Sequence, residues 1–277
     1  MNTVYIGRFS PALVFVALCA CSSCKAADTT PSADQPAAKA NLPPLVLDLG
    51  AGVRMQFVAI PAGEFRMGSE DGDKDEKPAH RVRITKPFYM GKYEVTQEQW
   101  QALMGKNPSR FKGAKNPVEC VSWFDCPKFL EKLAAKAPKG FTCCLPTEAE
   151  WEYACRAGTT TKYHFGDDEN ELADYAWYDK NSDKRTHPVG EKKPNPWGLY
   201  DMYGNCWEWC QDLYVNKYPA GDRTDPVVSQ PGKVPVLRVG SWFRPADRCR
   251  SAHRYKATPQ HRNGNLGFRV ALRRGTN

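Results

Sequence analysis

The sequence LPTEAEWEY at residues 145–153 carries the clearest signal for a helix in the folded part of the chain. The hydroxyl of Thr147 can accept a hydrogen bond from the N–H of Glu150, and the Glu150 carboxylate can accept one from the N–H of Thr147. This reciprocal cap predicts a helix that begins directly after Thr147. A hydroxyl with the same spacing predicts two further helices, which begin at Thr96 and at Ser122.

The rest of the chain has a mixed pattern. Residues 57–60 and 81–84 read as strands, and the second of these alternates polar and apolar side chains. After Cys155 regular periodicity nearly vanishes, and over a hundred residues follow that are rich in Gly, Pro, Asn, Asp and Trp. A loop region of that length needs something to hold it in a compact domain, and metal ions or disulfides are the candidates.

Composition argues against nucleic acid as a partner. The 277 residues carry a formal charge of +8, from 39 basic and 31 acidic side chains. The basic side chains alternate with acidic ones instead of forming blocks, which is typical of a solvated surface.

The N-terminus has the pattern of an export signal. One cation, Arg8, precedes an apolar run at 12–18 that is too short to span a bilayer as a permanent helix. The run ends in LCAC, which resembles a bacterial lipobox with Cys21 as the acylated residue; an ordinary signal peptide with an incidental cysteine is the alternative. Ser22 favours the outer membrane, by resemblance to lipoprotein sorting in double-membrane bacteria. We therefore expect a lipid-anchored protein of the cell envelope that faces the periplasm.

Three regions follow from these patterns. Residues 1–20 are the predicted signal peptide, and residues 21–45, rich in Ala, Pro, Thr, Asp and Gln, are a predicted disordered tether. Residues 46–277 form the predicted folded domain. The chain contains eleven cysteines, and export makes disulfides plausible among them.

Five motifs, in order, carry a family likeness. They are IPAGEFRMG (60–68), YEVT (93–96), LPTEAEWEY (145–153), GNCWEW (204–209) and NLGFR (265–269). The domain resembles the formylglycine-generating enzymes, or sulfatase-modifying factors, over about residues 55–274. The resemblance implies an α+β fold, a variant of the C-type lectin fold with extensive irregular loops.

The resemblance also implies structural calcium. Family members bind calcium through the first and last side chains of a segment that matches 201–208 and through two carbonyls between them. The implied ligands here are Asp201, Gly204, Cys206 and Glu208. A second family loop implies a set at Asp174, Tyr175, Asn181 and Asp183. The alternative is that these acids and amides cap turns.

The family's catalytic metal is where the chain departs from the pattern. Well-studied members hold copper with two cysteines, three and eight residues after the serine of a Gly-Ser-aromatic motif, and thiolates are what select Cu(I). Here the serine is Ser241 and the residue three positions later is Arg244, which cannot ligate copper. Cys249 matches a structural half-cystine better, so copper is not expected.

The resemblance implies a disulfide between Cys155 and Cys249. A second family disulfide maps onto two apolar residues, Leu130 and Val270. Six other cysteines have no assigned partner, and they read as buried small hydrophobes, with a catalytic pair among them as the alternative: Cys120, Cys126, Cys143, Cys144, Cys206 and Cys210.

Three functions remain open from the sequence. The first is a calcium-stabilised, monomeric binding or accessory module that recognises a protein or peptide and meets the membrane only through its lipid. Its groove is inferred from where the family binds substrate: Trp207, Ser241, Trp242, Arg244 and Asn265. The second is a diverged enzyme that oxidises or matures a protein or peptide, on an oxidoreductase scaffold without the copper cysteines. The third is a true formylglycine-generating enzyme that uses displaced cysteines.

Overall fold

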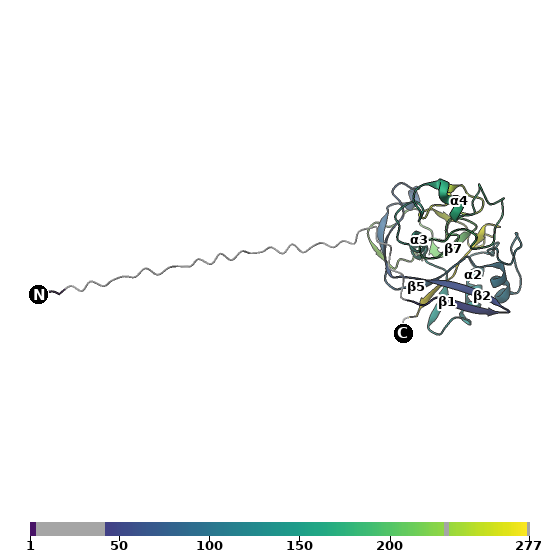
Figure 1. The fold of residues 1–277 in the computed structure, drawn as a ribbon, viewed down its shortest axis with the longest axis horizontal. Helices are drawn as coiled ribbons and strands as arrows, with labels where there is room; N and C mark the ends of the chain where they lie inside the picture. The colour runs from purple at the N-terminus through teal and green to yellow at the C-terminus, as the bar shows by residue number, and fades with distance from the viewer. Residues whose placement is uncertain (4–41, 230–232, 276–277) are drawn as a thin grey trace. The chain divides into compact units, whose positions relative to one another are not determined.

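The computed structural model describes residues 1–3, 42–229 and 233–275, drawn in colour in Figure 1. The predicted signal peptide, the acylated Cys21 and nearly all of the predicted tether lie outside the described residues. The first strand begins at Leu45, next to the predicted start of the domain at residue 46.

A five-stranded sheet brings the two ends of the folded domain together. Its strand order is β1-β2-β5-β12-β6, and every pairing is antiparallel. The C-terminal strand β12 lies between β5 and β6, and Ala271 is opposite both Met90 and Cys144. The strands are β1 (Leu45–Gly50), β2 (Val53–Ile60), β5 (Phe88–Gly91), β6 (Phe141–Cys144) and β12 (Ala271–Arg274).

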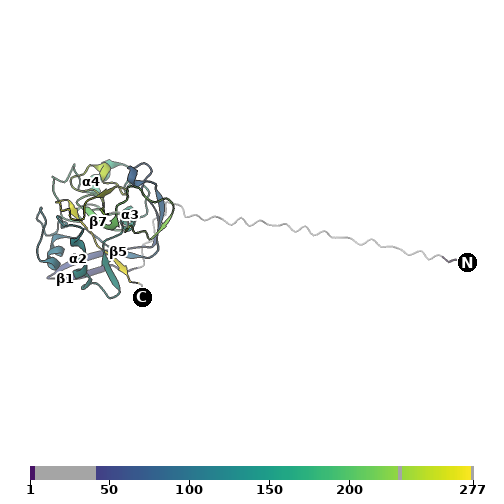
Figure 2. The same ribbon diagram turned by 180° about the vertical axis from the view of Figure 1, so that it is seen from behind.

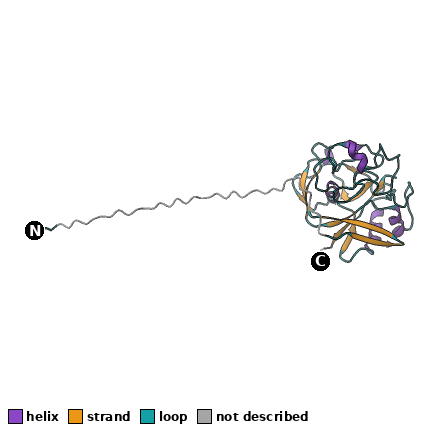
Figure 3. Ribbon diagram, viewed as in Figure 1, coloured by secondary structure: helices purple, strands orange, loops and turns teal. Residues whose placement is uncertain are grey.

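Two smaller sheets complete the strand structure, and both contain short strands from the loop-rich C-terminal half (Figure 3). One has the order β10-β9-β7-β11, and its pair β11–β7 is parallel. The other has the order β3-β4-β8. The strands are β3 (Gly63–Met67), β4 (His80–Ile84), β7 (Trp207–Leu213), β8 (Arg223–Thr224), β9 (Pro235–Arg238), β10 (Arg254–Lys256) and β11 (Leu266–Gly267).

The helices are few and short. Both Thr96 and Thr147 form the predicted reciprocal caps, with Gln99 and Glu150 returning the bond. The prediction at Ser122 was wrong in its geometry, because the Ser122 hydroxyl donates to Asp125 at 2.6 Å instead of accepting from the backbone. The helices are α1 (Gln97–Met104), α2 (Asp125–Ala134), α3 (Glu148–Arg156) and α4 (Leu172–Tyr175), with 3-10 turns η1 (Lys74–Glu76), η2 (Glu169–Glu171) and η3 (Ala246–Arg248).

Helix α3 crosses the middle of the domain beside β7, as Figures 1 and 2 show from opposite sides. All nine of its residues are buried, three glutamates among them. Glu148 pairs with Arg238 and Arg254, and Glu152 pairs with Arg238 and Arg156. Buried charges are tolerated only when paired and hydrogen-bonded, so these arginines allow the helix to lie in the core.

Two clusters of buried apolar side chains form the core. One surrounds Trp151 on α3, and the other contains Trp207 and Trp209 on β7. Leu130 and Val270, the apolar pair expected at a family disulfide position, both belong to the second cluster. None of the described helices is long and apolar enough to cross a membrane.

Candidate functional site

The candidate site begins at the turn that Ser241 opens after β9. Ser241 is buried, and its carbonyl accepts a hydrogen bond from the N–H of Arg244 at 2.9 Å, which closes the turn. The amide of Asn265 donates to the Ser241 hydroxyl at 3.4 Å. The indole of Trp242 donates to the carbonyl of Gly264 at 2.8 Å, so the loop before β11 is joined to this turn at two points.

Trp207, at the start of β7, contacts residues of the same turn and of the loop joined to it. Its backbone N–H donates to the carbonyl of Asn265 at 2.8 Å. Its ring stacks on that of Tyr255, with centroids 5.2 Å apart and an angle of 27° between the planes. The guanidinium carbon of Arg244 lies 5.8 Å from the Trp207 ring centroid and 5.3 Å from that of Tyr255. These are distances at which a cation is attracted to an aromatic face.

The structure therefore brings all five predicted groove residues into one connected group. We call Trp207, Ser241, Trp242, Arg244, Asn265 and Tyr255 the Ser241 cluster. Three cavities, of about 690, 370 and 360 Å³, lie elsewhere, and none of the predicted groove residues lines them. The Ser241 cluster instead meets solvent through Tyr255, which is 44% exposed, and the neighbouring Phe243 is 59% exposed.

Sequence reasoning missed three aromatic residues of this face. Tyr255 stacks on Trp207, Phe111 packs edge-on against Trp242 with ring centroids 5.4 Å apart, and Phe243 is exposed beside Trp242. The adjacent aromatic pair after Ser241 was a signal for Phe243. Tyr255 and Phe111 come from distant segments of the chain, and nothing in the local pattern marks them.

The first predicted calcium segment forms a tight loop before β7. Asp201 is buried with a φ of 60°, and its Oδ2 accepts from the N–H of Gly190 at 2.8 Å. Its Oδ1 is buried and has no hydrogen-bond partner among the described residues, so it is an acceptor available to a cation. A side chain at Gly204 would place its Cβ 2.2 Å from the carbonyl oxygen of Trp177, so this turn requires glycine.

Glu208 ends the segment, inside a group of three buried carboxylates. Arg269 donates to both oxygens of Glu208 at 2.6 Å, while Glu94 accepts from the N–H of Cys206 at 2.9 Å. Burial and the neighbouring charges of Asp201 and Glu208 raise the pKa of Glu94. Burial raises the pKa of Asp201 to about 6. Both Glu208 oxygens are occupied, by Arg269 and by the Trp151 indole at 2.7 Å, and both Glu94 oxygens accept hydrogen bonds. Among these three carboxylates the Oδ1 of Asp201 is therefore the oxygen left to ligate a cation.

The second predicted calcium set has different surroundings. Asp174 is exposed and pairs with Lys193 at 2.7 Å, and Asp183 is also exposed. The Asn181 side chain accepts from the N–H of Tyr178 at 2.8 Å and donates to the carbonyl of Ala176 at 2.9 Å, so it closes a turn. The ring of Tyr175 stacks on Phe165. These contacts favour the alternative reading of this set as turn caps.

The one cluster of three potential metal-ligating side chains among the described residues was not predicted. It consists of Asp73, Glu76 and His253, whose ligand atoms lie within 4.8 Å of one another. Both carboxylates are already neutralised, Asp73 by Arg248 at 2.6 Å and Glu76 by Arg250 at 2.7 Å. This cluster therefore reads as an ion-pair network rather than as an open metal site.

Residues 51–274 match the family of the sulfatase-modifying factor enzyme 1-like domain. The chain belongs to this family. The predicted resemblance and the predicted fold class, a C-type-lectin-like α+β domain with a few short helices and many loops, are both confirmed.

Members of this sulfatase-modifying factor family that resemble the chain carry several names. A formylglycine-generating enzyme of Streptomyces coelicolor is 30% identical over 77% of this chain and 88% of its own length. A serine/threonine-protein kinase pkn1 of Chlamydia pneumoniae is 33% identical over 78% of this chain, which spans 38% of that relative's length. A chaperone protein LppX of Paenibacillus barcinonensis is 33% identical over 46% of this chain and 62% of its own.

Among solved structures, Treponema denticola variable protein 1 has a closely similar fold. Its TM-score to this chain is 0.77 at 33% identity, and the match covers 83% of this chain and 99% of that one. Membership in the sulfatase-modifying factor family therefore establishes the domain and its fold. The variety of names among the relatives means that membership alone does not establish the activity.

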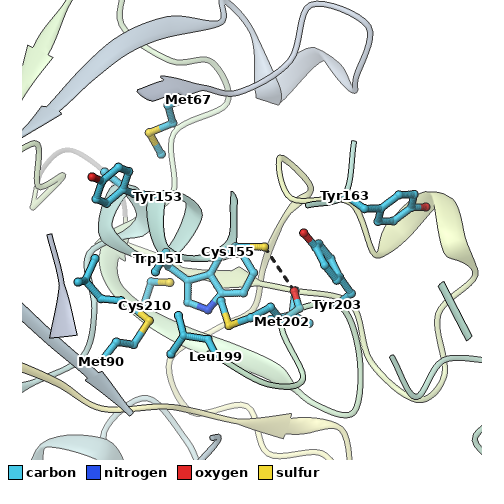
Figure 4. Packing of buried hydrophobic residues seen from close by; sticks show 14 of the residues in the cluster. Met67, Met90, Trp151, Tyr153, Cys155, Tyr163, Leu199, Met202, Tyr203 and Cys210 are labelled. Atoms are coloured by element: carbon cyan, nitrogen blue, oxygen red, sulfur yellow. Dashed lines mark hydrogen bonds between the residues drawn. The ribbon is translucent and has the colours of Figure 1, made fainter. Parts of the chain in front are cut away.

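The disulfide implied by the family resemblance is not present in the structure. Within residues 42–229 and 233–275 neither Cys155 nor Cys249 has a disulfide partner, and each sulfur faces a different carbonyl. The thiol of Cys155 lies 3.6 Å from the carbonyl oxygen of Met202 (Figure 4). The thiol of Cys249 lies 3.9 Å from the carbonyl oxygen of Arg244. The side chains that contact the Cys155 thiol are those of Tyr203 and Ser251. The structure differs from the predicted pairing in that Ser251, two residues beyond Cys249, lies against the Cys155 thiol.

Cys249 lies close to Ser241 in the sequence and in the structure. It is eight residues after Ser241 and lies against the Ser241 turn, since a side chain at Gly240 would place its Cβ 2.4 Å from the Cys249 sulfur. Cys249 therefore stands at the second of the two family copper positions, while the first is Arg244. Burial raises the pKa of the Cys249 thiol, which keeps it protonated.

The six remaining cysteines of the described chain are also free. Burial raises the pKa of each thiol, to about 12 for Cys120 and about 11 for Cys143. Cys126, Cys206 and Cys210 are fully buried, and the pKa of each is raised well above its usual value by burial. The predicted role as small buried hydrophobes agrees with the placement of these three, whereas Cys120, Cys143 and Cys144 are only partly buried.

Proposed function

We propose that the protein is a binding or accessory module of the cell envelope, whose Ser241 cluster recognises a protein or peptide. The observation that carries this proposal is the position of Arg244. It takes the place of the first copper cysteine and packs against two aromatic rings, Trp207 and Tyr255. Tryptophan, tyrosine and arginine are the residue types that dominate binding hot spots.

The chemistry of the cluster supports binding rather than copper-dependent oxidation. Cu(I) is held by soft thiolate ligands, and the family's reaction needs two of them. Here a guanidinium replaces one thiol, and the other, that of Cys249, is buried with its pKa raised. A single protonated thiol beside a fixed positive charge is a poor site for a second cation.

Calcium has a structural role in this proposal. Asp201 and Glu208 with the carbonyls of Gly204 and Cys206 would hold the ion, and the unpartnered Oδ1 of Asp201 supports this assignment. The bound ion would neutralise the carboxylates of Glu94, Asp201 and Glu208 and stabilise the loop that positions Trp207. Calcium would take no part in recognition.

The lipid anchor at Cys21 would hold the domain at the membrane, with the outer membrane favoured by Ser22. The tether would let a monomeric domain reach a partner in the periplasm. We propose no direct contact of the folded domain with the bilayer.

The experiment that tests the proposal is a peptide-display selection against the whole chain, followed by affinity measurements on the selected peptides. Replacing Tyr255 or Phe243 with alanine is expected to weaken binding about tenfold or more, because each would remove exposed aromatic contact area. Val227→Ala is the matched control, since Val227 is 44% exposed and lines a cavity away from the cluster. Equal loss in the control, or no selected peptide at all, would contradict the proposal.

A copper titration separates binding from catalysis. The reduced chain is expected to show no tight one-to-one Cu(I) binding and no oxygen uptake with a Cys-x-Pro-x-Arg peptide. Tight one-to-one Cu(I) binding together with oxygen uptake would instead replace the binding module with a formylglycine-generating activity.

A further inference from the structure

Arg244 is held in a fixed orientation by aromatic surfaces instead of by an acid. Its guanidinium carbon lies over both Trp207 and Tyr255, at 5.8 and 5.3 Å from their centroids. Its backbone is also fixed, since its N–H donates to Ser241 and its carbonyl accepts from the N–H of Asp179 at 3.1 Å. The donor groups of Arg244 are therefore preorganised before any ligand arrives.

The neighbouring arginines have different partners. Arg248 forms ion pairs with Asp73 and Asp247, and Arg250 forms an ion pair with Glu76. Arg244 has no ion pair with any carboxylate of residues 42–229 and 233–275, and its Nε is buried without an acceptor. A buried donor without an acceptor destabilises the fold, and more so when the group is charged.

A second unpaired donor belongs to the same group of side chains. The indole Nε1 of Trp207, a residue that is 1% exposed, has no hydrogen-bond partner in the part of the chain that the structure describes. In the same part of the chain the indole N–H groups of Trp209 and Trp242 both donate to carbonyls, at 3.0 and 2.8 Å. The Ser241 cluster thus contains two buried donors that lack acceptors, one of them cationic.

We propose that Arg244, Trp207 and Tyr255 form an anion subsite, at which a carboxylate of the bound protein or peptide accepts hydrogen bonds from Arg244 and from the Trp207 indole. A carboxylate matches this site because it only accepts hydrogen bonds and pairs with guanidinium in a charge-assisted way. The inference rests on the proposed binding function and specifies its ligand: an acidic side chain or a C-terminal carboxylate.

The direct test uses small probes and nuclear magnetic resonance of the ¹⁵N-labelled whole chain. N-acetyl-aspartate methylamide presents a side-chain carboxylate, N-acetyl-glycine presents a terminal one, and N-acetyl-asparagine methylamide is the neutral control. Either acid is expected to shift the Trp207 indole N–H signal in a saturable manner, and the neutral compound is not. The acid that shifts the signal identifies which carboxylate the site prefers. No shift with either acid would overturn the inference, without any variant being needed.

Arg244→Gln tests the assigned residue, because glutamine keeps hydrogen-bonding capacity and loses the charge. This change is expected to abolish the shift and to lower the affinity for acidic selected peptides about 10- to 100-fold. Arg66→Gln, at an arginine that is 63% exposed and lines another cavity, is the matched control and is expected to change neither. An unchanged shift in Arg244→Gln would overturn the assignment.

Failure of this inference can be distinguished from failure of the proposed function. If the selection returns peptides that depend on Tyr255 but show no enrichment of acids, and the acidic probes give no shift, the anion subsite is wrong and the binding module stands. If the acidic probes shift the indole signal while no peptide is selected, the subsite stands and the protein-binding function fails.

Discussion

The carboxylate of Glu148, at the start of α3, accepts hydrogen bonds from Arg254 Nε at 2.6 Å and Nη2 at 2.8 Å. The two residues are 106 positions apart, and both are buried. This pair joins the central helix to β10 of the C-terminal region. This ion pair connects α3 to the C-terminal region, which is the connection expected of the disulfide between Cys155 and Cys249 that the family resemblance implied.

Glu148→Gln is expected to destabilise the domain by about 3–5 kcal/mol, because it leaves the buried guanidinium of Arg254 with an uncharged partner and Arg238 with Glu152 as its remaining carboxylate. Chemical unfolding of the whole chain measures the effect. Lys128→Gln serves as the control, since Lys128 is 67% exposed in its pair with Asp125 and is expected to cost below about 1 kcal/mol. Equal effects would show that the buried pair contributes no more than a surface pair.

Glu76 predicts a pH dependence of stability. Burial raises the pKa of its carboxyl, but contact with His253 and the hydrogen bonds from Arg250 outweigh burial and lower the pKa to about 2. A carboxyl with a depressed pKa stabilises the fold above its unfolded value of 4.5 and loses that contribution as the pH falls towards 2. The contribution is roughly 3 kcal/mol at neutral pH.

The measurement is the unfolding free energy of wild type and Glu76→Gln from pH 7 to pH 2.5. The difference between the two proteins is expected to stay constant down to about pH 4.5 and then to shrink as the wild-type carboxyl becomes protonated. A difference that is independent of pH would contradict the assignment to the Glu76 charge.

Calcium removal is expected to lower the melting temperature of the whole chain by about 5–10 °C, for calcium initially near a hundred times its dissociation constant. Asp201→Ala is expected to remove this calcium-dependent part. Asp174→Asn is the informative companion variant, because the side chain of Asp174 is 58% exposed and pairs with Lys193. A chelator without effect would remove calcium from the proposal, and a loss of calcium response in Asp174→Asn would restore the second set.

The free thiols lead to a prediction about oxidation. Alkylation of the unfolded, unreduced protein is expected to label both Cys155 and Cys249, and mass spectrometry of the peptides detects this. Ser251→Cys would place a second thiol opposite Cys155. Under oxidising conditions that variant is expected to form a disulfide and to gain roughly 4 kcal/mol of stability. A Cys155–Cys249 linked peptide from the wild type would show that the original pairing was right.

Local chemistry was sufficient to predict several features from the sequence. The caps at Thr96 and Thr147 follow from bonds between residues three positions apart, and alternation along 81–84 predicted β4. The order of five motifs predicted the family and the C-type-lectin-like fold. Two of these motifs contain Trp207 and Asn265, and the separate Gly-Ser-aromatic motif contains Ser241. The three residues lie together in the structure, because motif residues keep their relative places in a shared fold.

Only the tertiary structure decided the features that depend on residues distant in the chain. A shift of two residues exchanges Cys249 for Ser251 opposite Cys155, and spacing within one sequence does not reveal such a shift. The packing of Arg244 on Tyr255, and the lack of an acceptor for its Nε among the described residues, likewise depend on which distant segments the fold brings together. The sequence by itself determined the scaffold, because hydrogen bonding between near neighbours and apolar periodicity act locally. The fold decided which charges and thiols meet, because burial and pairing depend on segments that are far apart along the chain.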